Sequence, residues 1–305
     1  MIEKILSNKE KVFNIKNEIV NIDSIMIFDN GNVEKHFYHK DDLHEMRSLS
    51  KVVLALSIGV AIEEKLMNLD TLVCSYIKDL VKIKEENLSK IQKWTIRDLL
   101  LYAGGHAGMF LCKKDIKEKG LEEKDYLSYV LNYEMPYEVG ERSEYNNGDI
   151  FVLSVVFQKI TGEKLSSFAK RKIFEPLGII NFVWEEYDGY TAGATGLFLT
   201  NEDLFKIGQL ILNFGVYENN QIVPKWFVEE MCKPHIETPN VFNPERVLPK
   251  IANGFVFHIS RDGYVFKDGT HGQYLILNFE KKLLITILSE EKYMACVTEI
   301  LRGVI

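Results

Sequence analysis

The sequence predicts an α+β fold: an antiparallel β-sheet flanked by helices, with strands from both chain ends and an inserted, mostly helical domain. Three observations predict it. β-Rich apolar runs lie near the start of the 305-residue chain, similar runs lie near its end, and the segments between them carry helical patterns. We therefore expect a sheet domain over residues 1–69 and 191–305, and a helical domain over 70–190.

The first part of the chain carries a predicted hairpin and a predicted buried helix. Residues 1–20 have a polar, helical pattern. Residues 22–28 and 33–39 are two β-rich runs joined by Asn30-Gly31, and Asn-Gly between apolar runs is the strongest short hairpin signal. Residues 48–66 are apolar nearly all round, which indicates a buried helix.

The middle of the chain is predicted to be helical. Thr95 precedes an apolar run and has Asp98 three positions later, the pattern of a capped helix start. Residues 149–161 form an apolar helical run, and residues 165–173 have an amphipathic pattern. Two more helices are expected between residues 201 and 232. These segments supply the helices that we expect beside the sheet.

The last stretch of the chain changes to a strand pattern. Short polar turns, Asp268-Gly269 among them, separate its β-rich runs, and a short helix is expected over residues 294–302. The four predicted strands are residues 254–260, 263–267, 273–279 and 283–289. Strands that follow one another through such short turns predict an antiparallel meander.

Composition and charge exclude several classes of function. The chain has 37 basic and 44 acidic residues, a net charge of −7, which argues against nucleic acid or an anionic membrane surface as partner. No window approaches the roughly 20 apolar residues of a membrane span. The first residues lack the apolar run of a signal peptide, so we expect a cytoplasmic protein, with a trimmed secreted form as the alternative. The cysteines, which we expect to be free thiols, are Cys74, Cys112, Cys232 and Cys296.

The motif that could carry chemistry is Ser-x-x-Lys. Residues three apart lie on one face of a helix, so the lysine can reach the serine oxygen, and a desolvated lysine can act as its base. We favour Ser48 and Lys51, because this pair opens the predicted buried helix, where the lysine would be desolvated. The other matches lie on polar or acidic stretches: Ser75/Lys78, Ser167/Lys170 and Ser289/Lys292.

Two further segments could complete a site. Tyr145-Asn146-Asn147, before a predicted helix, could supply a phenol proton shuttle and an amide, although it also fits a turn with a surface tyrosine. Residues 267–272, Lys-Asp-Gly-Thr-His-Gly, lie at the junction of two predicted strands. They could bind a carboxylate and turn backbone N–H groups toward a substrate, or could form only a tight turn.

These three segments, in this order, resemble the serine β-lactamase and penicillin-binding-protein superfamily. The resemblance covers residues 22–300 and is greatest to class C-like serine hydrolases, which include esterases, amidases and D-peptidases. Residues 47–51 resemble the family's Ser-x-Ser-Lys helix start, and Tyr145-Asn146-Asn147 resembles its Tyr-x-Asn. Lys267-Asp268-Gly269 stands where the family has Lys-Thr-Gly or His-x-Gly. The resemblance implies a β-lactamase/transpeptidase-like fold with the site between its two parts.

The resemblance also implies a mechanism. Ser48 would attack a carbonyl and form an acyl-enzyme, with Lys51 as base and Tyr145 as its partner and proton donor to the leaving group. The backbone N–H groups of Ser48 and Thr270 would form the oxyanion hole, and no metal or cofactor is implied. The residues expected to bind substrate or orient the lysine are Asn147, Lys267, Asp268, Gly269, Thr270 and His271.

The resemblance leaves three functions open. The first is a serine hydrolase that cleaves an ester or amide of a small molecule or peptide. Asp268 departs from the family pattern, and its carboxylate should repel an anionic ligand, so we expect an uncharged or cationic acyl substrate. The second is a β-lactamase or D,D-carboxypeptidase, and the third is a non-catalytic ligand-binding or sensor protein on the same scaffold.

Overall fold

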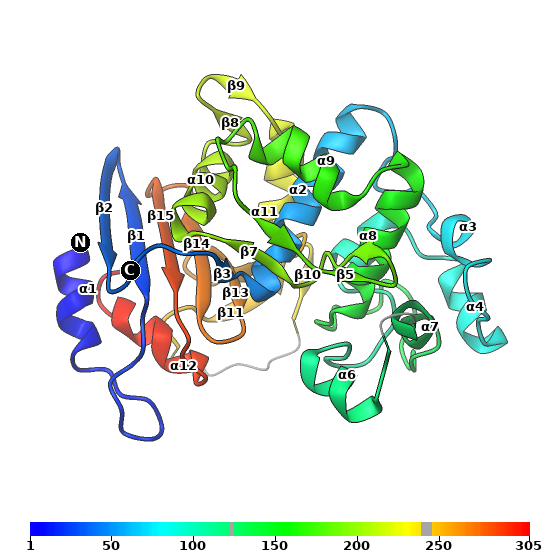
Figure 1. The fold of residues 1–305 in the computed structure, drawn as a ribbon, viewed down its shortest axis with the longest axis horizontal. Coiled ribbons are helices and arrows are strands. Elements are labelled where there is room, and N and C mark those ends of the chain that lie inside the picture. The colour runs from blue at the N-terminus through cyan, green and yellow to red at the C-terminus, as the bar shows by residue number, and fades with distance from the viewer. Residues whose placement is uncertain (123–124, 239–245) are drawn as a thin grey trace.

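The computed structural model describes residues 1–122, 125–238 and 246–305. Its main feature is an eight-stranded antiparallel sheet (Figure 1). This sheet and the helices around it confirm the α+β prediction. In spatial order the strands are β10 (Ile236–Glu237), β11 (Lys250–Asn253), β12 (His258–Ser260), β13 (Val265–Gly269), β14 (Gln273–Asn278), β15 (Leu283–Leu288), β1 (Ser24–Asp29) and β2 (Asn32–Phe37).

The sheet joins the two ends of the chain through β1 and β15. Their register runs from the Ser24–Leu288 pair to the Asp29–Leu283 pair. On its other side β1 pairs with β2 through the predicted hairpin. Asn30 and Gly31 have φ values of 48° and 99°, and two such positive φ angles are what a tight type I′ turn requires.

Each face of the sheet packs against its own layer of helices. Strand residues alternate between the faces, so in β15 Leu284 belongs to one core and Ile285 to the other. The first core holds α2 (Ser50–Glu63) and α10 (Asn201–Leu212). The second is covered by α1 (Ile2–Lys9), α12 (Met294–Val297) and a 3₁₀ turn, η4 (Thr298–Leu301), which lie together in Figure 1.

Helix α2 (Ser50–Glu63) lies at the centre of the molecule, with nearly all of its side chains buried. Close contact with α11 (Lys225–Cys232) explains Gly59, since a Cβ there would lie 2.4 Å from the Phe227 ring. The predicted helix started at Ser48, but Ser48 lies in a 3₁₀ turn, η1 (Arg47–Leu49), that leads into α2.

The other helices gather on the far side of α2 from the sheet (Figure 1). The predicted cap is confirmed: Asp98 N donates to Thr95 Oγ1 at 3.2 Å, and Thr95 N donates to Asp98 Oδ2 at 2.9 Å. These helices are α3 (Cys74–Ile77), α4 (Glu85–Ile91), α5 (Ile96–Leu100), α6 (Lys113–Lys119), α7 (Tyr126–Leu131), α8 (Gly148–Thr161) and α9 (Leu165–Ala169), which continues as a π-helical turn, η3 (Lys170–Phe174).

Small sheets complete the fold. Three short strands form one of them and two hairpins form the others. The three-stranded sheet orders β3 (His44–Glu45), β7 (Leu197–Leu199) and β4 (Val183–Trp184); the hairpins are β5 (Glu186–Tyr187) with β6 (Tyr190–Thr191), and β8 (Val216–Tyr217) with β9 (Asn220–Gln221). Strand β3 ends just before η1 and so fixes the approach of the chain to Ser48.

Some element predictions were wrong. The first helix ends at Lys9, and the Asn14 side chain then accepts hydrogen bonds from Lys16 N and Glu18 N, a local alternative to helix. Asp268 and Gly269 lie within β13, because their backbones pair with β14, and the turn follows at residues 270–272. The division at residues 69/70 and 190/191 stays a prediction.

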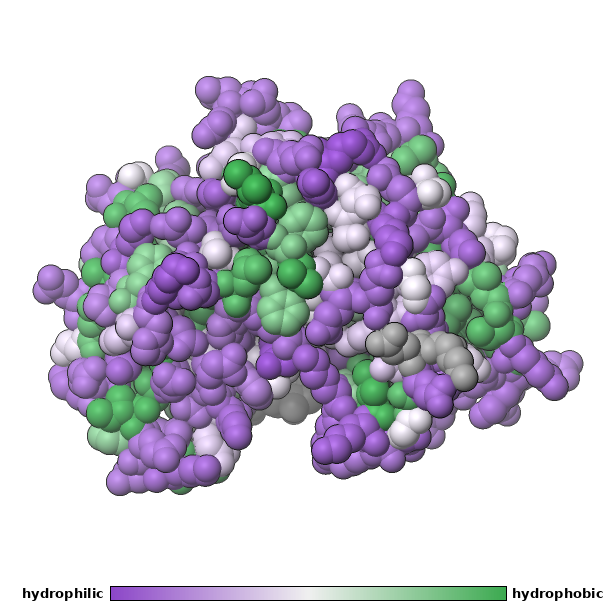
Figure 2. Space-filling model, in the orientation of Figure 1, coloured by the Kyte–Doolittle hydropathy of each residue, from purple (hydrophilic) through white to green (hydrophobic). Residues whose placement is uncertain are grey.

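The face in Figure 2 is largely hydrophilic, and its apolar residues lie in separate groups. In the described part of the chain, no helix combines the length and apolar character needed to cross a membrane.

Candidate active site

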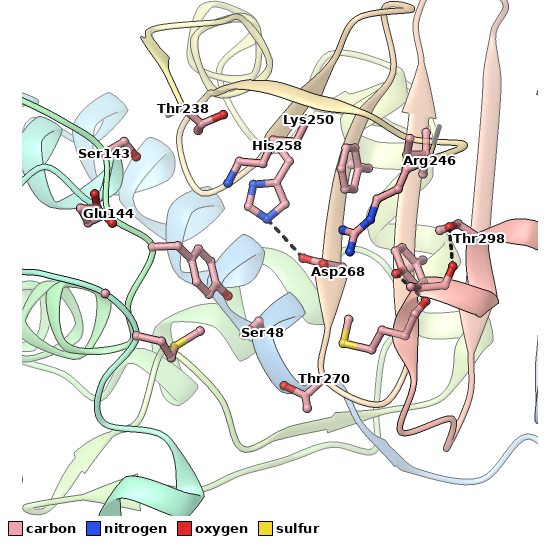
Figure 3. A pocket seen from close by; sticks show the side chains of 18 residues that line it. Ser48, Ser143, Glu144, Thr238, Arg246, Lys250, His258, Asp268, Thr270 and Thr298 are labelled. Atoms are coloured by element: carbon pink, nitrogen blue, oxygen red, sulfur yellow. Dashed lines mark hydrogen bonds and ion pairs between the residues drawn. The ribbon is translucent and has the colours of Figure 1, made fainter. Parts of the chain in front are cut away.

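The favoured serine opens onto a cavity of about 590 Å³ between the sheet and the helical side of the molecule. Figure 3 shows its labelled wall: Ser48 comes from the turn before the central helix, Asp268 and Thr270 come from the end of β13, and Ser143 and Glu144 come from the opposite side. Cavities of this size are typical of small-molecule sites.

The turn that carries Ser48 is strained and closely packed. Arg47 has a φ of 53°, in the left-handed region that costs a non-glycine residue about 1–3 kcal/mol. Its Nη1 atom holds Glu45 Oε2 at 2.6 Å. Strand β13 lies against this turn, so that a Cβ at Gly269 would be 2.8 Å from the carbonyl oxygen of Met46. The absence of a side chain at Gly269 therefore lets the end of β13 approach the serine turn.

Lys51 lies directly below the serine and is completely buried. Its Nζ atom lies 3.0 Å from Ser48 Oγ, 2.7 Å from Asn147 Oδ1 and 2.8 Å from the carbonyl oxygen of Ala194. Asn147 Oδ1 and the Ala194 oxygen are acceptors, so each of them takes a hydrogen bond from an N–H group of the lysine. The third position around the nitrogen faces the serine hydroxyl.

The surroundings of Lys51 favour its neutral form. Burial lowers the pKa of Lys51 well below its ordinary value, and the nearby positive charge of Lys267 lowers it further. A neutral amine has two N–H groups and one lone pair. In that neutral form, with the two N–H groups held by Asn147 and Ala194, the lone pair would face the Ser48 O–H.

Tyr145 lies in the segment before α8 and stays a neutral phenol. Burial raises the pKa of Tyr145, and a hydrogen bond with Ser48 offsets part of the rise. Two lysine amines flank its ring, Lys267 Nζ at 4.2 Å and Lys51 Nζ at 5.2 Å from the ring centre. Asn146 Oδ1 accepts from Asp149 N at 2.7 Å and so fixes this segment on the helix start. The structure thus brings Ser48, Lys51, Tyr145 and Asn147 together.

Lys267 and Asp268 lie side by side on β13 but on opposite faces of the strand. Lys267 is fully buried, and within the described residues its Nζ atom has no hydrogen-bond partner. Burial, with the charge of Lys250, lowers the pKa of Lys267 to about 7. Asp268 lines the cavity, where His258 Nε2 lies 3.2 Å from its Oδ1 atom. The hydrogen bond to His258 and the charges of Lys267 and Lys250 hold the pKa of Asp268 below its usual range.

Sequence reasoning missed His258 and Lys250, which both line the cavity. His258 Nδ1 lies 2.9 Å from Asn253 Oδ1, and burial lowers the pKa of His258 to about 3. Burial lowers the pKa of Lys250 to about 8. The two strands predicted within residues 254–267 could have revealed the histidine. His258 pairs with Phe266 across this hairpin, and this places His258 diagonally across from Asp268.

Thr270 and His271 lie apart from each other. Thr270 lines the cavity at the end of β13. The His271 ring is held elsewhere, with Nδ1 3.0 Å from Glu290 Oε2, and it does not belong to the described cavity lining. The structure therefore does not bring His271 into the group around Ser48.

The four Ser-x-x-Lys matches differ clearly in their surroundings. Lys51 is buried, whereas the lysines of the other three matches are exposed. The serine of one of these matches, Ser289, donates to the carbonyl oxygen of Asn21 at 2.6 Å and so has a structural role. In the described part of the chain, no group of three or more His, Cys, Asp or Glu side chains is placed to hold a metal ion.

The fold is that of a known family of proteins. A family model described as Beta-lactamase matches residues 24–299. The chain therefore belongs to the beta-lactamase family, a family of serine hydrolases. The comparison with curated proteins finds no match.

Solved structures with this fold carry several different names. EstCE1, a hydrolase with promiscuous acyltransferase activity, is similar with a TM-score of 0.75 and 14% identity, over 99% of this chain and 98% of that one. A class C beta-lactamase from Rhodobacter sphaeroides gives 0.71 and 14%, over 99% of both chains. An octameric penicillin-binding protein homologue from Pyrococcus abyssi gives 0.71 and 18%, over 99% of this chain and 75% of that one. At these identities the likeness shows the fold alone.

Proposed function

We propose that this protein is a serine hydrolase that cleaves a small-molecule ester or amide through an acyl-enzyme on Ser48. The observation that carries the proposal is the contact between a buried Lys51 and Ser48 Oγ, 3.0 Å apart, with the other two acceptors of the amine already assigned. A serine needs such a base to become a nucleophile. The lysine is kept neutral enough to be that base by its burial.

In the first half-reaction Lys51 takes the proton of Ser48 as Oγ bonds to the substrate carbonyl carbon. The C–O or C–N bond of the leaving group then breaks, and the leaving group receives a proton through Tyr145. Tyr145 suits this role because it is a neutral phenol that contacts Ser48. In the second half-reaction water adds to the acyl carbon by the same route in reverse, releasing the acid and restoring the Ser48 hydroxyl.

The developing oxyanion needs donors on the far side of the carbonyl from Lys51. We assign the backbone N–H groups of Ser48 and Thr270 to this role, since Gly269 brings the end of β13 against the serine turn. Each such donor typically increases kcat by a factor of about 10²–10³. Asn147 holds Lys51, Lys267 supports the Tyr145 ring, and we assign neither of them to proton transfer.

The test is the intact mass of the protein after treatment with a fluorophosphonate probe. We expect one adduct, which is absent in Ser48→Ala and present in Ser75→Ala and Ser167→Ala, the matched changes in two other Ser-x-x-Lys segments. No adduct in the folded wild type, or an adduct that survives in Ser48→Ala, would overturn the proposal. A ligand that stabilises the protein without turnover would then favour the non-catalytic alternative.

A second incubation with a penicillin separates the two catalytic readings. A general esterase or amidase should leave the penicillin intact and carry no stable adduct. Rapid loss of the penicillin, or a stable adduct on Ser48, would favour the β-lactamase or D,D-carboxypeptidase alternative.

A further inference from the structure

Two positively charged side chains line the cavity. Lys250, at the start of β11, and Arg246, in the segment before it, both line the space onto which Ser48 opens. Within the described residues neither of them forms a hydrogen bond or an ion pair. In Figure 3 the Lys250 amine lies beside the His258 ring, and Arg246 points into the cavity from the other end.

The acidic groups of the same cavity are already engaged. Asp268 is held by His258 at 3.2 Å and has Lys267 behind it on the same strand. Glu144 lies 3.9 Å from Arg142 Nη1. These contacts weaken the repulsion that we expected from Asp268, because His258 and Lys250, which sequence reasoning missed, act on its carboxylate together with Lys267. Lys250 feels the carboxylates of Asp268 and Glu144 only at longer range, and among the described lining residues Lys250 and Arg246 keep no ion-pair partner.

Most of the remaining wall is apolar. Met109, Leu248, Phe266, Tyr274 and Met294 line it. In such surroundings a cation is poorly hydrated, and burial already lowers the pKa of Lys250 to about 8, so its charged form gains from a nearby anion. A ligand that fits this wall has an apolar body and one negatively charged end.

We propose that Lys250, with Arg246 as a second contact, binds a carboxylate of the substrate while the scissile ester or amide lies at Ser48. The charged hydrogen bond from the Lys250 ammonium would select acidic substrates over neutral ones of the same length. This inference rests on the proposed function and names its substrate class: a mono-acid whose ester or amide bond is separated from the carboxylate by an apolar spacer.

The test compares matched esters. 4-Nitrophenyl hemiglutarate carries the carboxylate on the acyl side, 3-carboxyphenyl butyrate carries it on the leaving group, and 4-nitrophenyl butyrate and phenyl butyrate are their neutral counterparts. We expect wild-type protein to prefer at least one acid in kcat/KM. In Lys250→Gln the ratio of kcat/KM for the acid to kcat/KM for its neutral counterpart should fall about tenfold or more, as expected for a lost charged hydrogen bond.

Other variants distinguish a binding role from a structural one. Lys250→Arg should restore most of the preference, and Arg246→Gln should lower it less than Lys250→Gln does. Lys78→Gln, an exposed lysine on the helical side, should change nothing. Equal loss for acid and neutral esters in Lys250→Gln, or a wild type without any preference for acids, would overturn the inference.

If none of the four esters is hydrolysed, that result speaks against the proposed function, and a binding measurement still tests the carboxylate site. Titration calorimetry with monomethyl glutarate and with dimethyl glutarate gives the affinities directly. We expect the acid to bind more tightly than the diester, and Lys250→Gln to abolish the difference. If the wild type bound the acid and the diester with equal affinity, the carboxylate site would be refuted, whatever the catalytic result.

Discussion

Lys51 Nζ lies 2.7 Å from Oδ1 of Asn147, a residue 96 positions further along the chain. Asn147 also donates from Nδ2 to the carbonyl oxygen of Leu111 at 3.1 Å, so its amide can turn only one way. A neutral acceptor in this place orients the lysine amine without adding a negative charge that would keep it protonated. The same position therefore controls both the direction and the basicity of the base.

Replacing that amide by a carboxylate should impair the base. In Asn147→Asp, a negative charge beside Lys51 favours the protonated amine and raises its pKa. Because the neutral amine is the active form, the acid limb of the pH profile of kcat/KM should move to higher pH, and activity at pH 7 should fall at least about tenfold. Asn146→Asp is the control, since Oδ1 of Asn146 caps Asp149 and the side chain does not contact Lys51. An unshifted limb in Asn147→Asp would contradict this account.

Removing the neighbouring positive charge should shift the same limb. Lys267 is a cause of the lowered Lys51 pKa, second to burial. In Lys267→Met the protonated form of Lys51 loses that repulsion, its pKa rises, and the acid limb of kcat/KM moves to higher pH. The shift should be partial, because burial remains. The measurement uses a neutral ester. If the acid limb moved to lower pH in Lys267→Met, the group that titrates in this limb could not be Lys51.

Gly269 should matter for activity more than for stability. A Cβ there would lie 2.8 Å from Met46 O, a backbone atom, and would push β13 away from the Ser48 turn. We expect Gly269→Ala to lower kcat by about 10²-fold or more, the value of one oxyanion donor. Gly208→Ala is the matched control, because its Cβ would meet the side chains of Leu284 and Leu275, which do not belong to the described cavity lining. It should lower the melting temperature but leave kcat per folded molecule unchanged.

His258 should make the fold sensitive to acid. Its pKa is about 3 in the folded chain against an ordinary 6.5, so protons bind the unfolded chain more readily. This contribution to stability is therefore complete above pH 6.5 and is lost as pH falls toward 3, by about 1.4 kcal/mol per pH unit. Urea unfolding at several pH values should show a shallower acid slope in His258→Gln than in the wild type. The exposed His39→Gln variant should keep the wild-type slope, and an equal slope in all three proteins would refute the assignment.

Sequence reasoning captured those parts of the site that depend on local pattern. The Asn30-Gly31 hairpin and the apolar helix after Ser48 are both local signals, and the helix alone separated Lys51 from the three solvated lysines. Lys250 could not be found this way, because it begins a four-residue strand whose partners depend on register. The contact of Lys51 with the Ala194 carbonyl oxygen could not be predicted either, because any residue type can supply a backbone acceptor.

The pairing of β1 with β15 has a consequence for synthesis. Residues Ser24–Asp29 leave the ribosome well before β15 and can form their hairpin with β2 at once. Their other edge waits for Leu283–Leu288, some 250 residues later (283 − 29 = 254). At about 5–20 residues per second this takes roughly 10–50 s, during which a largely apolar strand edge stays open to other chains. The nascent chain is thus most prone to aggregation through its first strand, and a chaperone that covers this edge should raise the folded yield.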